Sequence, residues 1–110
     1  MKTSWKDRAR ILNHLKLKNT TKVLEIELYY HTGGMNFFAG QTEERGIYLS
    51  VTPADITKNS RCITAFSGTK LCLKPVKRFS QKEFNTFTYK SEDLQKLIDH
   101  VLRKNKLELL

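Results

Sequence analysis

Lysines and arginines gather in two parts of this sequence, and their chemistry points first to phosphate binding. Residues 56–82 contain seven lysines and arginines and no acid, and residues 1–22 contain seven against a single aspartate. Ordinary surfaces mix both signs of charge, so two such blocks indicate a polyanionic partner. The alternative is a solvated surface that only keeps the chain in solution. The candidate phosphate-binding residues are Lys6, Arg10, Arg61, Lys70, Lys74, Lys77 and Arg78.

Aromatic residues beside these blocks add a second kind of contact. Phe37, Phe38 and Tyr48 are candidate stacking groups, because aromatic rings stack on the bases of single-stranded nucleic acid while cations contact its phosphates. Neighbouring strand residues point to opposite faces, so an extended segment cannot place both Phe37 and Phe38 in one core. The alternative is that these rings fill the surface of a sheet.

Catalytic and metal-binding patterns are weaker. His31, Arg45 and Tyr48 could form an acid–base cluster for RNA cleavage, which makes a small ribonuclease a further hypothesis. The histidines lack metal-ligand spacing, and Cys62 and Cys72 form no CxxC pair. The glycines match neither a P-loop nor a dinucleotide fingerprint. We therefore expect no metal, no cofactor and a non-enzymatic protein.

The charge pattern also supports a different class of function. Residues 23–55 hold five acids and one arginine, so an acidic arm separates the two basic blocks. Such blocks of unlike charge steer protein partners. The alternative hypothesis is therefore an interaction module or inhibitor that recruits an acidic protein, or a second copy of itself, by strand addition at an exposed edge.

Length and composition set the broad class. A chain of 110 residues is expected to form a single domain over residues 1–110. With 39% hydrophobic and 28% charged residues, its composition is that of a globular protein. No segment is apolar enough to span a bilayer, and no secretory leader is recognisable at the N-terminus. We expect a cytoplasmic protein without a membrane partner, in which two cysteines fit a reducing compartment.

Two segments alternate between apolar and polar residues and predict half-buried strands. In residues 22–31, Leu24, Ile26, Leu28 and Tyr30 share one face. Residues 46–52 show the same period of two. Pro53 is expected to end this second strand, because proline cannot donate to a strand ladder.

The chain between and after these strands predicts turns and a hairpin. Residues 35–39 are either a short strand or a loop, and residues 41–46 are expected to form a turn. Residues 61–66 and 69–76 predict a hairpin around a Ser-Gly turn, with Arg61, Lys70 and Lys74 together on its outer face. A two-residue turn would place the two cysteines on opposite faces, whereas a three-residue turn would allow a disulfide.

Two helices complete the prediction. Residues 4–17 have apolar residues at helical spacing, with Lys6, Arg10 and His14 on a separate basic edge. Residues 91–104 carry a continuous apolar stripe, and Ser91 is the expected N-cap. Residues 79–89 remain ambiguous, with a last short strand as one reading of residues 87–89.

Together these features predict an α+β fold. An antiparallel sheet of four to five strands would have an N-terminal and a C-terminal helix packed on one face. The leading functional hypothesis is a small basic accessory protein that binds single-stranded DNA or RNA without catalysing a reaction. Architecture alone does not establish that function, so it depends on where the cations lie in space.

Overall fold

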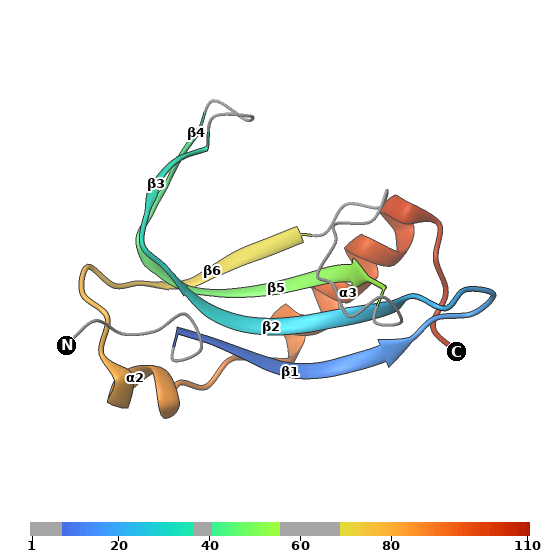
Figure 1. Cartoon of the computed structure of the whole chain (residues 1–110), viewed down its shortest axis with the longest axis horizontal. Helices are drawn as coiled ribbons and strands as arrows, with labels where there is room; N and C mark the ends of the chain where they lie inside the picture. Colours follow the sequence, from blue (N-terminus) through green and yellow to red (C-terminus); the bar gives the residue numbers. More distant parts are fainter. Residues whose placement is uncertain (1–7, 37–40, 56–68) are drawn as a thin grey trace.

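The computed structural model describes residues 8–36, 41–55 and 69–110, and these form six strands and two helices. In chain order they are β1 (Ala9–Lys16), β2 (Val23–His31), β3 (Gly34–Asn36), β4 (Gln41–Glu43), β5 (Gly46–Ala54), β6 (Thr69–Pro75), α2 (Gln81–Asn85) and α3 (Ser91–Asn105). Four strands form an antiparallel main sheet in the order β1-β2-β5-β6. Strands β3 and β4 form a separate arm that projects from it (Figure 1). The α+β class and the antiparallel sheet are therefore confirmed.

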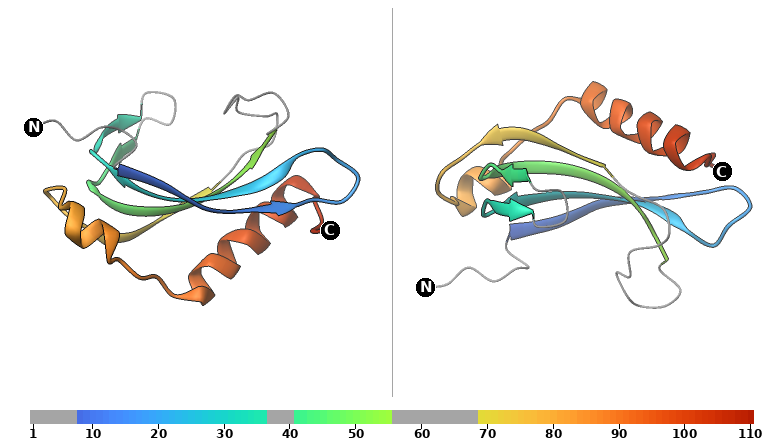
Figure 2. Two further views of the ribbon diagram at one scale, coloured as in Figure 1. Left: turned by 60° about the horizontal axis from the view of Figure 1, so that its bottom comes forward. Right: turned by 90° about the horizontal axis from the view of Figure 1, so that it is seen from above.

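Both helices lie on one side of the main sheet (Figure 2). Phe84 of α2 and Ile98 and Val101 of α3 are buried in the core against that side. We call it the helix face, and we call the opposite side the far face. The far face carries alternate residues of the two central strands, namely Glu25, Glu27, Tyr29, His31, Tyr48, Ser50 and Thr52.

The alternation predicted for the two central strands is confirmed. Leu24, Ile26 and Leu28 of β2 lie opposite Pro53, Val51 and Leu49 of β5, and all six are at most 2% exposed. Burial of each leucine contributes about 1.5–3 kcal/mol relative to exposure. The hydrophobic effect therefore fixes the register of the sheet, because a slip by one residue would turn these side chains to the far face.

The helix predicted over residues 4–17 is wrong from residue 9 onward. Residues 9–16 form β1, which pairs with β2, and residues 1–7 lie outside the described part of the chain. Membership of the sheet gives the backbone of this segment its hydrogen-bond partners and gives its apolar side chains a core to enter. Those gains exceed the few tenths of a kcal/mol per residue that separate ordinary helix propensities (roughly 0–0.7 kcal/mol).

A β-bulge explains why this strand has the spacing of a helix. The register with β2 shifts between Ile11 and Asn13, so Leu12 is an extra residue in β1 near Ile26. Leu12 and Leu15 both pack against the core although they are three residues apart. In a regular strand that spacing would place them on opposite faces.

Strand β5 begins at Gly46 as expected but is longer than expected, and the segment before it also differs from the prediction. It continues through Pro53 to Ala54, so proline does not end it. Strand β6 begins opposite Val51, so Pro53 lies beyond the reach of β6, at a position where a strand edge tolerates proline. Residues 41–43, expected in a turn, form β4 and pair with β3, and residues 37–40 are not described.

Strand β6 confirms the second arm of the predicted hairpin, and it pairs with β5. The first arm, residues 61–66, includes Arg61 and Cys62 and lies outside the described residues. Cys72 in β6 is a half-buried free thiol. The disulfide alternative therefore has no support.

The ambiguous segment from 79 to 89 contains a short helix and no strand. The Ser80 hydroxyl accepts a hydrogen bond from the Glu83 N–H at 3.3 Å and caps α2. The helix predicted over residues 91–104 is confirmed as α3. Its N-cap is Lys90, which makes no side-chain capping bond, so the prediction that Ser91 caps this helix is wrong.

The chain after α3 returns to the sheet. Lys106 adopts a left-handed conformation and ends the helix, and Leu109 then forms an isolated bridge with Leu17 beside the end of β1. The backbone N–H of Lys18 donates to the Glu108 carbonyl at 2.9 Å. No helix in the described ranges is long and apolar enough to cross a membrane.

The opposed leucines Leu49 and Leu71 provide a test of the core. Leu49 is fully buried, whereas Leu71, its partner in β6, is 38% exposed. We expect Leu49→Ala to lower the free energy of unfolding by about 2–5 kcal/mol and Leu71→Ala by less than about 1.5 kcal/mol. Urea unfolding followed by circular dichroism measures both. Equal losses in the two variants would contradict this assignment of the core.

Candidate anion-binding site

A basic cavity of about 350 Å³ lies at one end of the main sheet. We call it the end cavity. Its cations come from three separate parts of the chain: the residue before β1, the residue before β5, and the segment that follows β6. The lining residues are Arg8, Tyr30, Thr32, Arg45, Lys77, Arg78 and Phe79.

The antiparallel topology brings these segments together. The last residue of β2, His31, lies opposite Gly46, and Gly46 lies opposite Pro75 at the end of β6. The residues just beyond these positions must therefore lie side by side. The N–H of Val76 donates to the Arg45 carbonyl at 3.1 Å, which extends the pairing past the end of β6.

Gly46 allows the unusually close approach of β5 and β6 at this end. A Cβ atom at this position would collide with the carbonyl oxygen of Lys74 and would also lie 3.1 Å from the Cα of Pro75. Only glycine lacks that atom, so the backbone of β6 can pass directly beside β5. The segment that carries Lys77 and Arg78 is held against Arg45 as a result.

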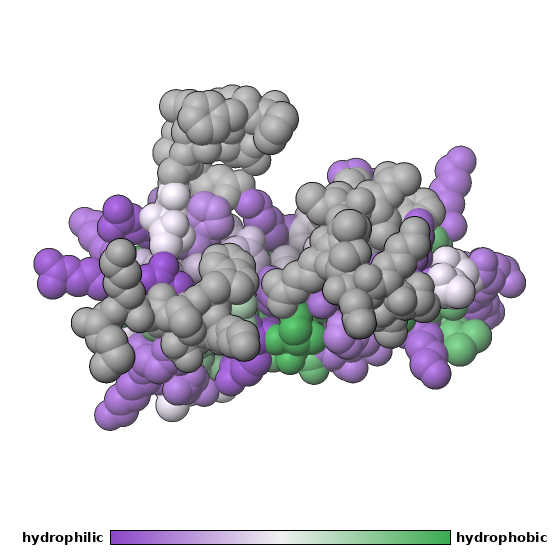
Figure 3. All heavy atoms as spheres, in the orientation of Figure 1, coloured by the Kyte–Doolittle hydropathy of each residue, from purple (hydrophilic) through white to green (hydrophobic). Residues whose placement is uncertain are grey.

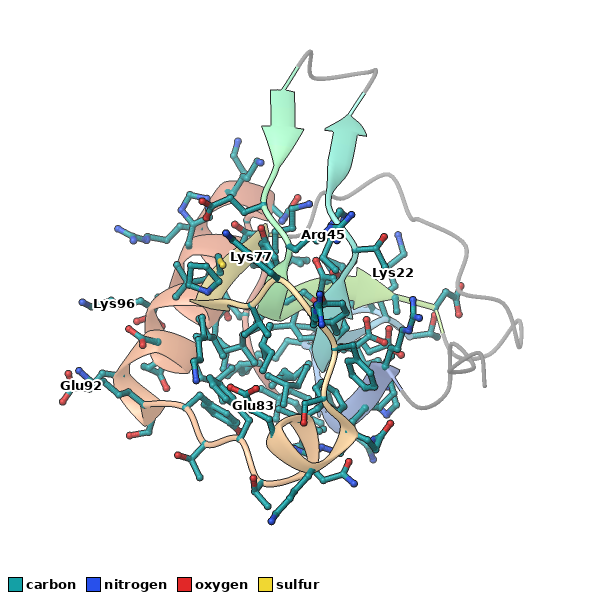
Figure 4. The ribbon with its side chains drawn as sticks, turned by 90° about the vertical axis from the view of Figure 1, so that its left-hand side faces the viewer. Lys22, Arg45, Lys77, Glu83, Glu92 and Lys96 are labelled. Atoms are coloured by element: carbon teal, nitrogen blue, oxygen red, sulfur yellow. The ribbon has the colours of Figure 1, made fainter. Side chains whose placement is uncertain are left out.

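Arg45 and Lys77 lie next to each other at the end cavity (Figure 4). One terminal nitrogen of the Arg45 guanidinium donates to the Lys77 carbonyl at 3.4 Å. A guanidinium has five N–H donors, so this bond directs Arg45 toward the Lys77 segment while other donors remain for a ligand. On the face drawn in Figure 3, most of the coloured side chains at the end of the molecule that carries α2 are hydrophilic.

Aromatic residues form the wall beneath the cations. The rings of Tyr30 and Phe79 are 5.1 Å apart, and the Tyr30 hydroxyl donates to the Val76 carbonyl at 3.1 Å. The Arg8 guanidinium carbon lies 5.7 Å from the centre of the Phe79 ring, a cation–π contact. The Nε of Arg8 is buried without a hydrogen-bond partner in the described part of the chain.

The charges of the cavity suit an anion. Among the described residues, four of those that line it are cations and none is acidic. A concave surface of one sign concentrates counter-ions, and arginine binds phosphate and carboxylate groups in a bidentate manner. An orphaned, buried guanidinium donor costs free energy until an acceptor reaches it. The arrangement can therefore bind an anionic group, and phosphate fits the mixture of arginine and lysine.

Only some of the predicted phosphate contacts meet in this cavity. Lys77 and Arg78 line it. Lys70 lies on the far face, with its Nζ 5.8 Å from the centre of the Tyr48 ring. Lys74, which was expected on the same outer face as Lys70, lies opposite Ile47 on the helix face.

The remaining predicted cations are also separated. Lys74 forms an ion pair with Glu83 of α2 at 2.6 Å. Arg10 lies over the Phe84 ring on the helix face, whereas His14 bonds Glu25 on the far face at 3.3 Å. The basic edge predicted for the N-terminal helix therefore does not exist in β1. Lys6 and Arg61 lie outside the described residues.

Of the three predicted stacking groups, Tyr48 packs against other residues of the sheet, and the other two lie outside the described part of the chain. Tyr48 is only 6% exposed, stacks on Tyr29 with the ring centres 5.7 Å apart, and donates its hydroxyl to the Glu44 carbonyl at 2.9 Å. Phe37 and Phe38 lie outside the described residues. The far face around Tyr48 also carries two acids of β2, which repel a polyanion.

The residues of the ribonuclease hypothesis are divided between two places. The rings of His31 and Tyr48 are 5.6 Å apart on the far face. The Nδ1 of His31 accepts a hydrogen bond from the Gly33 N–H at 2.9 Å. Arg45 instead lines the end cavity. The described ranges contain no group of three His, Cys, Asp or Glu residues that could hold a metal ion.

A second basic hollow lies at the other end of the sheet, between the β1–β2 turn and the C-terminal segment. Its volume is about 470 Å³, and Lys18, Lys22 and Lys106 contribute the cations. Glu108 also lines it and lies 3.8 Å from Lys18, so part of its charge is neutralised. The end cavity is therefore the stronger anion site.

Sequence reasoning missed Arg8 and Arg45 as partners of Lys77 and Arg78. Arg8 precedes the strand that was taken for a helix, and Arg45 is the only cation in an acidic segment. Their position next to strand ends could have indicated this site, because the ends of neighbouring antiparallel strands lie side by side. No family model matches the chain, and comparison with curated proteins and with solved structures also finds no match.

The hydroxyl of Tyr30 should hold the Val76–Phe79 segment in place. Tyr30→Phe leaves the Val76 carbonyl without this partner, and we expect a loss of about 0.5–1.5 kcal/mol in the free energy of unfolding. Tyr89→Phe is the matched control, because the Tyr89 hydroxyl makes no hydrogen bond within the described residues. Urea titration compares the two variants, and an equal effect on both would contradict the positioning role of Tyr30.

Proposed function

We propose that this chain is a small, non-enzymatic nucleic-acid-binding protein that favours single strands. The observation that carries the proposal is the convergence of Arg8, Arg45, Lys77 and Arg78 on one cavity, whose lining in the described part of the chain includes no acid. Three separate segments supply these cations, so a long run of charge in the sequence does not account for them. Like charges at close range are unfavourable, and an anionic ligand removes that cost.

The partner we favour is a polyanion because of the charge outside the cavity. The whole chain has a formal net charge of +9, and Lys82 belongs to the same acid-free block as Lys77. Contacts with a polyanion release its condensed counter-ions, which strengthens binding by each exposed cation. A small isolated anion would gain nothing from these additional charges.

The site favours phosphate contacts over recognition of bases. Tyr30 is nearly buried, and both Tyr30 and Phe79 have their rings packed against neighbours, so these walls offer little surface for stacking. Phosphate contacts position a nucleic acid but carry no sequence information directly. A flexible single strand can bend a phosphate into a concave site, whereas a duplex is stiff over about 150 base pairs. We therefore expect little sequence preference.

Salt dependence tests this function. Four phosphate contacts on a single strand, made by the cavity together with exposed cations around it, should give a slope of roughly −3 when log K is plotted against log salt concentration. Fluorescence anisotropy with a labelled oligonucleotide measures the slope, and gel analysis of the same RNA should show intact strands. Absence of binding at low salt would contradict the proposal, and cleavage of the RNA would contradict its non-enzymatic part.

Two lysine variants locate the site. Lys77→Gln removes a cation of the end cavity, and Lys96→Gln removes an equally exposed cation from the outer side of α3 (Figure 4). We expect Lys77→Gln to weaken binding about five- to tenfold and to reduce the salt slope by about 0.7. Lys96→Gln should change binding by less than about twofold. Equal effects would show that net charge alone drives binding.

A protein-interaction module remains the second candidate, and the β3–β4 arm favours it. The arm projects from the main sheet, and in the described residues its strands pair only with each other (Figure 1). The outer edges of such a ribbon present backbone donors and acceptors that a further strand can pair with. The simplest partner is a second copy of this chain.

Light scattering tests the arm. If two copies pair through it, the molar mass should rise to that of a dimer as the protein concentration increases. Thr42→Pro removes a backbone donor from β4 opposite Met35 and should keep the chain monomeric. A wild-type chain that is monomeric at every concentration, or a dimer that Thr42→Pro does not weaken, would contradict this candidate.

A further inference from the structure

We infer that the end cavity recognises a terminal phosphate of the nucleic acid, a phosphomonoester, in preference to the internal diesters. This inference rests on the proposed function and makes it specific. Its argument depends on how many charges and donors the cavity offers to a single group.

The charge of the cavity exceeds what one internal phosphate can balance. Arg8, Arg45, Lys77 and Arg78 bring four positive charges to a cavity of about 350 Å³. A phosphodiester carries one negative charge, whereas a phosphomonoester carries about −1.5 to −2 at pH 7. The electrostatic gain in a site of this kind therefore roughly doubles for the chain end.

The donors of the cavity also match a phosphomonoester. Arginine forms two parallel hydrogen bonds to a pair of phosphate oxygens, and a lysine ammonium adds a further donor. A phosphomonoester has three terminal oxygens and a phosphodiester has two. Arg45 donates to the Lys77 carbonyl at 3.4 Å, and its other donors are left for the phosphate oxygens.

Arg8 provides a second, independent observation that favours an anionic ligand. Its guanidinium lies over the Phe79 ring, and its Nε is buried without a hydrogen-bond partner in the described part of the chain. Buried polar groups normally find partners, so this unpaired donor, beside a cavity whose described lining contains no acid, is suited to an anionic acceptor. The terminal nucleotide of a nucleic acid is linked to the next nucleotide on one side only. Its phosphate can therefore enter a concave site without a bend in the rest of the strand.

The inference is tested with three labelled single strands of one sequence, bearing a 5′-phosphate, a 3′-phosphate or hydroxyl groups at both ends. We expect at least one phosphate-ended strand to bind about tenfold more tightly than the hydroxyl-ended strand, the effect of an additional charge-assisted contact. The comparison of the two phosphate-ended strands shows which end the cavity takes.

Variants assign the preference to the cavity. Arg45→Gln should abolish the preference for a phosphate end, and Lys77→Gln, at an exposed position where folding is not at risk, should reduce it. Lys96→Gln should leave it unchanged. Equal affinity for all three strands overturns the inference and leaves nucleic-acid binding intact. Failure of every strand to bind at low salt overturns the proposed function itself.

Discussion

The close contact between the backbones of β5 and β6 at Gly46 is the constraint on which the basic end of this molecule depends. A side chain at this position would strike the carbonyl of Lys74, so the approach exists only because residue 46 is glycine. The contact places the Arg45 carbonyl within reach of the Val76 N–H at 3.1 Å. From there Arg45 reaches the backbone of Lys77, and two cations that are 32 residues apart become neighbours. The buried leucines of β2 and β5 supply the stability that holds like charges together.

The sequence predicted the two central strands and the C-terminal helix better than it predicted the N-terminal segment. Alternation in β2 and β5 is strong because one face of each strand is fully buried, and the apolar stripe of α3 is equally regular. The segment that forms β1 was misread because a bulge places Leu12 and Leu15 on the same side at a spacing of three. Pro53 was misread because its effect depends on which strands reach that position, and sequence alone does not show this.

The candidate site was predicted in part for a similar reason. Lys77 and Arg78 were recognised from the acid-free block, since local charge is visible in a sequence. Lys70 and Lys74 were expected on one face, but the register shift between Ile47 and Tyr48 places them on opposite sides of the sheet. Arg45 was hidden among acids, because pairing between distant strands decides its neighbours. The phosphate site that we propose therefore lies at the end of the sheet and not on the sheet surface, where Glu25 and Glu27 lie.

The most direct test of the account is a two-dimensional ¹H–¹⁵N spectrum of the chain titrated with a short, phosphate-ended single strand. The account predicts that the largest shifts fall on the amides of Arg45, Lys77 and Arg78 and on neighbouring Val76, with the C-terminal half of α3 unchanged. Shifts confined to the far face around Tyr48, or to the lysines beside the β1–β2 turn, would contradict the assignment of the end cavity as the phosphate site.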